Sequence, residues 1–213
     1  MAAIFRSPSG DPGTWKEVIN FPGWGQPGPF HVFKGALYVV SNNVSTADGS
    51  HAPEQIWRTY DGVKWEEVVS DGFGIPGTWW GLGGLADYQG YLYVGVATYD
   101  DNTNTSTGGQ IWRSQDGKHW RPVVQDGFGS TNNIKVDGLV VYQGELYAYT
   151  VNTIDGGSVF RTRDAKTWER VNQPGWGNPN YYCSHKNSNQ AVFKGDLYMG
   201  VIGLQGVLLK MIQ

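Results

Sequence analysis

Four copies of one short phrase divide the 213-residue chain into repeats of roughly 50 residues. In each copy an aliphatic residue, an aromatic residue, an arginine and a serine or threonine lead to a tryptophan a few residues later. The phrases begin at Ile4, Ile56, Ile111 and Val159, and the tryptophans are Trp15, Trp65, Trp120 and Trp168. Repeats of this length are typical of blades, solenoids and arrays. Features shared by all copies should therefore build the fold, and features that differ should carry the function.

Each repeat contains short runs in which apolar residues alternate with polar ones. In the second copy these runs are 55–58, 64–69, 84–88 and 91–97. Alternation indicates strands, because successive side chains of a strand point to opposite faces. Glycine-containing pairs such as Asp61-Gly62 supply the tight turns between them. We therefore predict an all-β protein, a β-propeller of four-stranded antiparallel blades that forms one domain over residues 1–213.

The turn after the arginine strand resembles the Asp-box (BNR) repeat of sialidase-like propellers. Arg113 to Trp120 carry the resemblance most clearly. In that family the box is a structural turn between the two outer strands of a blade, remote from the active site. Here aspartate and glycine are adjacent, whereas the family separates them by one residue, and Ala165 replaces the glycine in the fourth copy. The resemblance thus implies the scaffold, with the arginine strand third in its blade.

Sialidase activity is not implied, because that family grips its substrate with an arginine triad on the inner strands. The inner strands expected here, at 30–33, 85–88, 139–142 and 190–193, contain no arginine. The same strand order makes the chain begin with a third strand and end with another at 207–212. We expect four blades closed within a monomer. The alternative is that blades are completed between two chains of a homodimer.

Composition excludes several classes of function. The net charge is −3 and no lysine or arginine cluster occurs, which argues against nucleic acid as a partner. No apolar run approaches a membrane span, and the four histidines show no metal-ligand spacing, so we expect neither a membrane contact nor a metal or other cofactor. The single cysteine and the absence of a signal-peptide pattern favour a cytoplasmic protein, although a removed signal peptide would leave the same sequence.

Loops on one face of the propeller differ between the copies. The loops that lead into the inner strands, at 26–29, 75–82, 130–137 and 178–189, have different lengths and chemistry. Functional residues concentrate on variable loops held by a rigid scaffold. We therefore expect one asymmetric pocket on this face rather than four equivalent ones.

A carbohydrate-binding, lectin-like module is the function we favour. Adjacent tryptophans at 79 and 80 could stack on a sugar, although one of the two rings is expected to pack as core. Tyrosines and asparagines of the other loops would bind hydroxyls. The predicted ligand residues are Trp79, Trp80, Asn132, Asn133, Asn180, Tyr181, Tyr182, Asn187 and His31.

An enzyme acting on a small, largely apolar molecule at the same pocket is the first alternative. Cys183 and His185 lie two residues apart, a spacing that suits a nucleophile and its base on an extended segment. Lys135, Asp137 and Lys186 could supply polar or acid-base groups. This pattern is common by chance, since lone cysteines are usually buried and inert. A protein-interaction platform is the second alternative.

Overall fold

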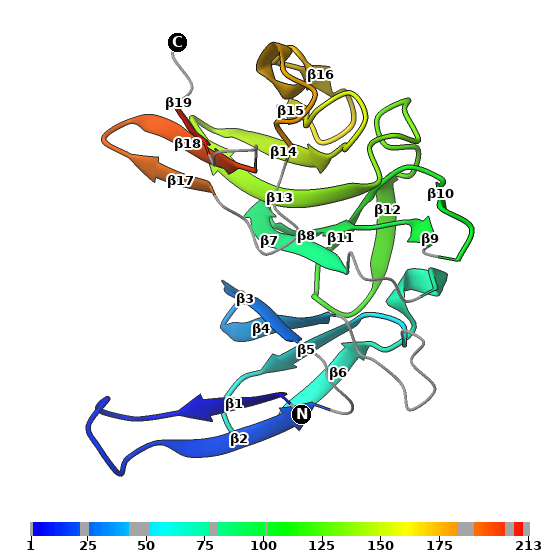
Figure 1. Ribbon diagram of the computed structural model, residues 1–213. Coiled ribbons are helices and arrows are strands. Elements are labelled where there is room, and N and C mark those ends of the chain that lie inside the picture. Colours follow the sequence, from blue (N-terminus) through cyan, green and yellow to red (C-terminus); the bar gives the residue numbers. More distant parts are fainter. Residues whose placement is uncertain are drawn as a thin grey trace. The chain divides into compact units, whose positions relative to one another are not determined.

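The computed structural model describes residues 2–21, 26–42, 52–76, 81–100, 102–182, 190–202 and, for the backbone, 207–210. Contacts divide the chain into two compact units, residues 1–81 and 82–213, which we treat separately. The described residues form strands and two short 3₁₀ turns, as expected for an all-β protein (Figure 1). No described helix is long or apolar enough to cross a membrane. That the two units make one domain stays a prediction.

The first unit contains a two-stranded and a four-stranded antiparallel sheet, ordered β1-β2 and β3-β4-β5-β6. The strands are β1 (Ala2–Arg6), β2 (Lys16–Phe21), β3 (Gln26–Phe33), β4 (Ala36–Asn42), β5 (Gln55–Thr59) and β6 (Trp65–Val69), followed by the 3₁₀ turn η1 (Gly72–Gly74). Ile4, Phe21 and Val39 form a core cluster against which Trp57 and Trp65 pack. These two repeated tryptophans are therefore scaffold, as predicted.

The second unit contains two four-stranded sheets, a three-stranded sheet and a short two-stranded ribbon (Figure 1). The strands are β7 (Leu82–Tyr88), β8 (Tyr91–Val96), β9 (Tyr99–Asp100), β10 (Thr105–Ser106), β11 (Gln110–Ser114), β12 (Trp120–Val124), β13 (Lys135–Tyr142), β14 (Glu145–Val151), β15 (Val159–Thr162), β16 (Glu169–Arg170), β17 (Gln190–Phe193), β18 (Asp196–Val201) and β19 (Val207–Lys210), with the 3₁₀ turn η2 (Pro174–Gly177) before β17. The sheet orders are β7-β8-β11-β12, β13-β14-β15-β16 and β17-β18-β19.

The predicted third position of the arginine strand is confirmed for the four-stranded sheets. In the three four-stranded sheets, β5, β11 and β15 each lie third, between the second and fourth strands. The predicted last strand also forms, as β19, and pairs with β18. Both edges of β18 are thereby occupied, by β17 and β19, while β1 and β2 form a sheet of their own in the first unit.

The Asp-Gly turns are structural, as the repeat predicted. In the turn after β11, Ser114 Oγ accepts a hydrogen bond from the Gly117 amide at 2.8 Å, and Asp116 Oδ1 accepts from the His119 amide at 2.8 Å. Thr59 with Asp61 and Thr162 with Asp164 make the same bonds in their turns. Ala165 adopts a φ of +53°, in the left-handed region. Gly117, the equivalent residue of the third copy, has a φ of +72°. The fourth copy therefore keeps the turn without its glycine.

These backbone donors stabilise the ionised aspartates. The Thr167 and Lys166 amides lower the pKa of Asp164 from 3.8 to about 2. Amides of the equivalent residues also lower the pKa of Asp61 and of Asp116. A carboxyl whose pKa is lower in the folded state stabilises the fold above its unfolded pKa, and this contribution disappears as the pH falls through the folded value.

Lowering the pH should therefore remove the difference in the free energy of unfolding between the wild type and the variant Asp164→Asn. At pH 5 the wild type should be the more stable protein, and the difference should shrink as the pH falls through 3.8 toward about 2. Urea unfolding of both proteins across this range measures the difference. A difference independent of pH would show that the ionised form of Asp164 is not the one that the turn stabilises.

Adjacent sheets of the second unit pack backbone against backbone. A Cβ atom added to Gly83 or Gly95 would overlap the Val136 carbonyl oxygen, and one on Gly109 would lie 2.6 Å from the Lys135 carbonyl carbon. Strand β13 therefore crosses β7 and β8 at a distance that only glycine permits.

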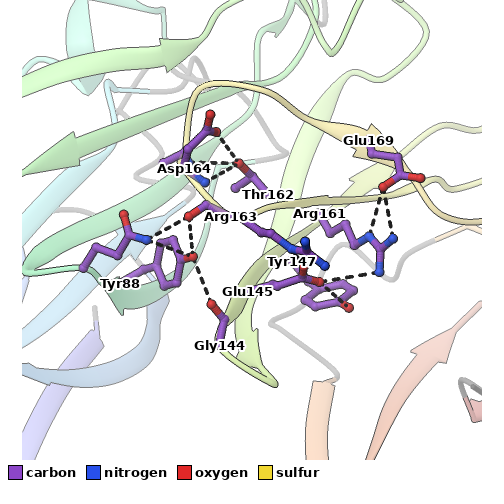
Figure 2. Close-up of polar contacts among 11 residues, drawn as sticks. Tyr88, Gly144, Glu145, Tyr147, Arg161, Thr162, Arg163, Asp164 and Glu169 are labelled. Atoms are coloured by element: carbon purple, nitrogen blue, oxygen red, sulfur yellow. Dashed lines mark hydrogen bonds and ion pairs between the residues drawn. The ribbon is translucent and has the colours of Figure 1, made fainter.

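Tyrosine hydroxyls tie each sheet of the second unit to the next. Tyr88 Oη donates to the carbonyl oxygens of Gly144 at 3.0 Å and Arg163 at 2.8 Å, as Figure 2 shows. Tyr142, at the equivalent position of the following repeat, donates to the Gly195 carbonyl oxygen at 2.7 Å. Both tyrosines are the first aromatic residue of the repeated hairpin, which explains one part of the repeat as a contact between sheets.

Candidate functional site: a polar loop cluster

Three loops of the second unit converge into one group, here called the polar loop cluster: residues 130–134, 152–158 and 178–182. Asn132 Nδ2 donates to Asp155 Oδ2 at 2.9 Å, which joins the first two loops. The Gly157 amide donates to the Tyr181 carbonyl oxygen at 2.8 Å, which joins the second to the third. Five of the predicted ligand residues, Asn132, Asn133, Asn180, Tyr181 and Tyr182, lie in this cluster.

The middle loop is shaped by its own side chain and by a close approach. Asn152 Oδ1 accepts hydrogen bonds from the amides of Ile154 at 3.0 Å and Asp155 at 2.8 Å, as in an Asx turn. Gly156 follows with φ of +92° and lies against Gly175, so a Cβ atom there would be 2.5 Å from the Gly175 Cα atom. The Asx turn and the close contact with η2 thus fix the conformation of this loop.

Asn133 is the centre of a buried hydrogen-bond network that links the first two loops of the cluster. It is 4% exposed, and its Nδ2 donates to the Gly127 carbonyl oxygen at 2.8 Å. Its Oδ1 accepts from Thr150 Oγ1 at 3.2 Å and from Asn152 Nδ2 at 3.0 Å. Direct contact with a ligand, as predicted for Asn133, would require this buried network to open.

Asp155 is the one acidic residue of the cluster, and two side-chain amides orient its carboxylate. It is exposed, and its Oδ2 accepts from Asn132 Nδ2 and, at 3.2 Å, from Asn152 Nδ2. These two amides lower the pKa of Asp155, so its carboxylate stays ionised near neutral pH. Neither Asn152 nor Asp155 was predicted, because their loop is short and the differences between the repeats are largest in the long loops. The Asx-turn pattern of an asparagine three residues before an aspartate was the available signal.

The third loop adds two aromatic rings at the edge of the cluster. Tyr181 and Tyr182 are half-buried, and Asn180 is exposed, with its amide bound to Asn178 Oδ1 at 3.0 Å. Tyr182 is anchored by paired backbone hydrogen bonds with Ile202, of 3.2 and 2.7 Å. The tyrosine backbones are therefore fixed, while the rings remain partly accessible.

Lys135 and Asp137 form a buried ion pair at the start of β13. Lys135 Nζ lies 2.7 Å from Asp137 Oδ1, and the side chains are 1% and 0% exposed. Both were predicted as possible catalytic groups of an enzyme. A substrate atom cannot reach either one without displacing the structure above it, and their pairing accounts for their burial without a reaction.

Of the other predicted residues, one lies in the first unit and the rest lie outside the described residues. Trp79, Trp80, Cys183, His185, Lys186 and Asn187 lie outside the described residues. His31 is half-buried on β3 in the first unit, opposite Tyr38. Over the described part of the chain no three histidine, cysteine or acidic residues group as metal ligands.

A second polar group lies on β14, β15 and the turn before β16, around a cavity of about 350 Å³ (Figure 2). Glu145 pairs with Arg163 and, at 3.5 Å, with Arg161, while Arg161 pairs with Glu169 at 3.1 Å. Arg163 lowers the pKa of the Glu145 carboxyl. The charges of this group neutralise one another, so it is a structural network of its sheet.

No protein-family model matches the chain, and no curated protein matches it. Solved structures do resemble it. A GH43B protein of the Bacteroides ovatus xyloglucan PUL is 13% identical, with a TM-score of 0.52 over 89% of this chain and 39% of that one. An α-L-arabinanase of Penicillium chrysogenum, solved with arabinobiose, is 15% identical, with a TM-score of 0.52 over 99% and 70%. A prolyl endopeptidase is 12% identical, with a TM-score of 0.58 over 98% and 28%.

At these identities the similarity concerns the fold alone. It supports a β-propeller scaffold for this all-β chain, and it does not support the more specific assignment to the Asp-box family. The chain spans 39% of the length of the GH43B protein and 28% of that of the endopeptidase. Since one scaffold carries both sugar-directed and peptide-directed proteins, function has to be argued from the loops.

Proposed function

We propose that this protein is a carbohydrate-binding β-propeller and that the polar loop cluster is its glycan site. The observation that carries the proposal is the exposed Asp155 carboxylate, oriented through Oδ2 by two amides. Among the described residues none donates to its Oδ1. An ionised, oriented acceptor at the surface is suited to a pair of sugar hydroxyls, because hydrogen bonds to charged groups are the stronger ones.

The neighbouring side chains fit the same ligand chemistry. Tyr181 and Tyr182 offer partly accessible rings, whose faces match the apolar faces of sugars and whose hydroxyls can donate or accept. Asn180 adds an exposed amide. Asn187 remains a proposed member of the site, and Trp79, Trp80 and His31 remain proposed carbohydrate-binding residues. Glycan sites generally combine such rings with a few placed polar groups.

The first probe is arabinobiose, the sugar with which the similar arabinanase was solved. If a panel of neutral disaccharides including arabinobiose yields a ligand, Asp155→Asn should weaken its binding about tenfold, since the lost charge-assisted hydrogen bond contributes about 1.5 kcal/mol or more. Isothermal titration calorimetry measures both proteins. Asp164→Asn is the matched control, because it removes an equally exposed carboxylate from a structural turn of the same unit.

Two results would count against the site. Equal affinities of wild type and Asp155→Asn would remove Asp155 from it. The carbohydrate-binding function would be excluded if no disaccharide of the panel bound and if Tyr181→Ala and Tyr182→Ala gave the same result as the wild type on a broader glycan array.

We also propose that four blades close within a monomer, with completion of blades between two chains as the alternative. Four repeats and the four-stranded sheets support the blade number. Measurement of the mass in solution by light scattering decides between the two, since a species that is only dimeric would favour the intermolecular ring.

An enzyme at the same loops is the less supported function. Its nucleophile-base pair, Cys183 and His185, lies outside the described residues, and Lys135 and Asp137 are shielded by burial. Binding is the function that the described geometry supports best.

A further inference from the structure

The repeated arginine has a fixed partner position on the neighbouring strand. In each repeat the strand that carries the arginine pairs with the strand that follows it, and the arginine lies directly opposite one residue of that strand. The pairs are Arg6 with Lys16, Arg58 with Glu66, Arg113 with Arg121, and Arg161 with Glu169. Side chains opposite each other in an antiparallel pair are about 5 Å apart at Cβ, so their charges interact.

Three of these pairs are compensated inside their own sheet. Arg58 pairs with Glu66, and Arg161 with Glu169, the latter visible in Figure 2. In the sheet β7-β8-β11-β12 both residues of the pair are arginines. The centre of the Tyr91 ring lies 4.6 Å from the guanidinium carbon of Arg113 and 5.6 Å from that of Arg121. Each arginine therefore meets either a carboxylate or an aromatic face.

The pair of Arg6 and Lys16 has no such compensation. Across the described ranges, no carboxylate pairs with either cation and no aromatic ring lies against one. Like charges directly opposite each other on paired strands are unfavourable. Both side chains line a cavity of about 610 Å³ in the first unit, with Pro8, Val18 and Val63 among its walls.

Cations outnumber carboxylates two to one in the lining of this cavity. Its one carboxylate belongs to Glu17, whose Oε1 accepts from Asn20 Nδ2 at 3.4 Å and forms no ion pair in the described structure. The Arg6 side chain lies over the turn at Gly62, where its Cδ and Nε atoms would be 3.4 Å from an added Cβ atom. Thr14, another lining residue, is bound to Ser7 Oγ and the Asp11 carbonyl oxygen.

We propose that the Arg6–Lys16 cavity binds a small organic carboxylate, which pairs with Arg6 as the carboxylates of Glu66 and Glu169 pair with the arginines of their sheets. Arginine is suited to this ligand because its planar fork binds both carboxylate oxygens. The apolar walls, Pro8, Val18 and Val63, select an acid with an apolar body over an inorganic anion. This site lies in the first unit and does not depend on the glycan site proposed in the second.

Benzoate is the probe, and titrations of the full chain are followed by backbone amide chemical shifts. Saturable shifts should appear at Arg6, Lys16 and Val63. Lys16→Gln should weaken benzoate binding at least threefold. Lys16→Glu should weaken it at least tenfold, because the new carboxylate would pair with Arg6 as a glutamate does in the sheets of Arg58 and Arg161. Lys118→Glu, the same charge change on an exposed lysine of the second unit, should alter binding by less than twofold.

Neutral and inorganic probes separate the sources of affinity. Benzamide tests the apolar walls alone, and inorganic phosphate tests the charge alone; both should bind at least fivefold more weakly than benzoate. Equal binding of benzamide or of phosphate overturns the carboxylate assignment. Absence of saturable shifts with benzoate, or unchanged affinity in a Lys16→Gln protein with native amide dispersion, overturns the site itself.

Discussion

Replacing Asp137 with asparagine should lower the free energy of unfolding by about 3 to 5 kcal/mol. Asp137 and Lys135 are 0% and 1% exposed and lie 2.7 Å apart, so the carboxylate is what offsets the desolvated ammonium group. Asparagine has nearly the same shape but no charge, and the Lys135 cation would remain in the interior without its counter-ion. Urea unfolding followed by tryptophan fluorescence measures the change.

Two comparisons identify the ion pair as the cause. The double variant Lys135→Met with Asp137→Leu should recover most of the lost stability, because replacing a whole buried pair by apolar residues is often neutral or better. Glu169→Gln breaks an exposed pair with Arg161 and should cost less than about 1 kcal/mol. A small effect of Asp137→Asn, similar to that of Glu169→Gln, would mean that water reaches Lys135.

Alanine at position 95 should destabilise the second unit by about 3 kcal/mol, near the upper end of what overpacking costs. The added Cβ atom would overlap the carbonyl oxygen of Val136, and backbone cannot move aside as a flexible side chain can. Strand β13 would have to shift away from β8, and with it Lys135 and the loop that carries Asn132.

Gly90→Ala is the matched control in the same sheet. Gly90 has φ of +78° and nothing within 4 Å of an added Cβ atom, so alanine there meets only the conformational cost of about 1 to 2 kcal/mol. Denaturant midpoints of the two variants separate steric overlap from backbone conformation. If Gly95→Ala were no worse than Gly90→Ala, the sheets would be less closely packed than the backbone positions indicate.

Much of the fold could be predicted because its signals are local. Alternation over residues 91–97 predicted a strand that forms as Tyr91–Val96, and the Ser-x-Asp-Gly spacing predicted turns whose side chains cap their own backbone. Such features depend on neighbours a few residues away, and the repeat states each of them several times. The glycines at the contact between adjacent sheets were not predicted, because Gly95 and Gly109 contact a strand that comes later in the chain.

The candidate site was predicted in part. The loops at 130–137 and 178–189 were chosen for their difference between repeats, and the structure brings Asn132 and Tyr181 into one cluster. Asp155 was missed, because its importance comes from donors 23 and 3 residues away rather than from its own neighbourhood. Lys135 and Asp137 were predicted as possible polar or acid-base groups of a pocket, and only the structure shows that they are a buried ion pair.

The sequence by itself determined the repeated strands and the turns between them, because period-two alternation and turn residues act over short distances. The order of the strands within the four-stranded sheets was implied by the resemblance of the turn to the Asp-box repeat. Only the tertiary structure decided which polar groups meet, which are desolvated and which cations are compensated. Those properties depend on strand register and on close approach between distant segments: register sets Arg58 opposite Glu66 but Arg6 opposite Lys16, and a sheet built around Gly83 and Gly95 buries the charges of β13.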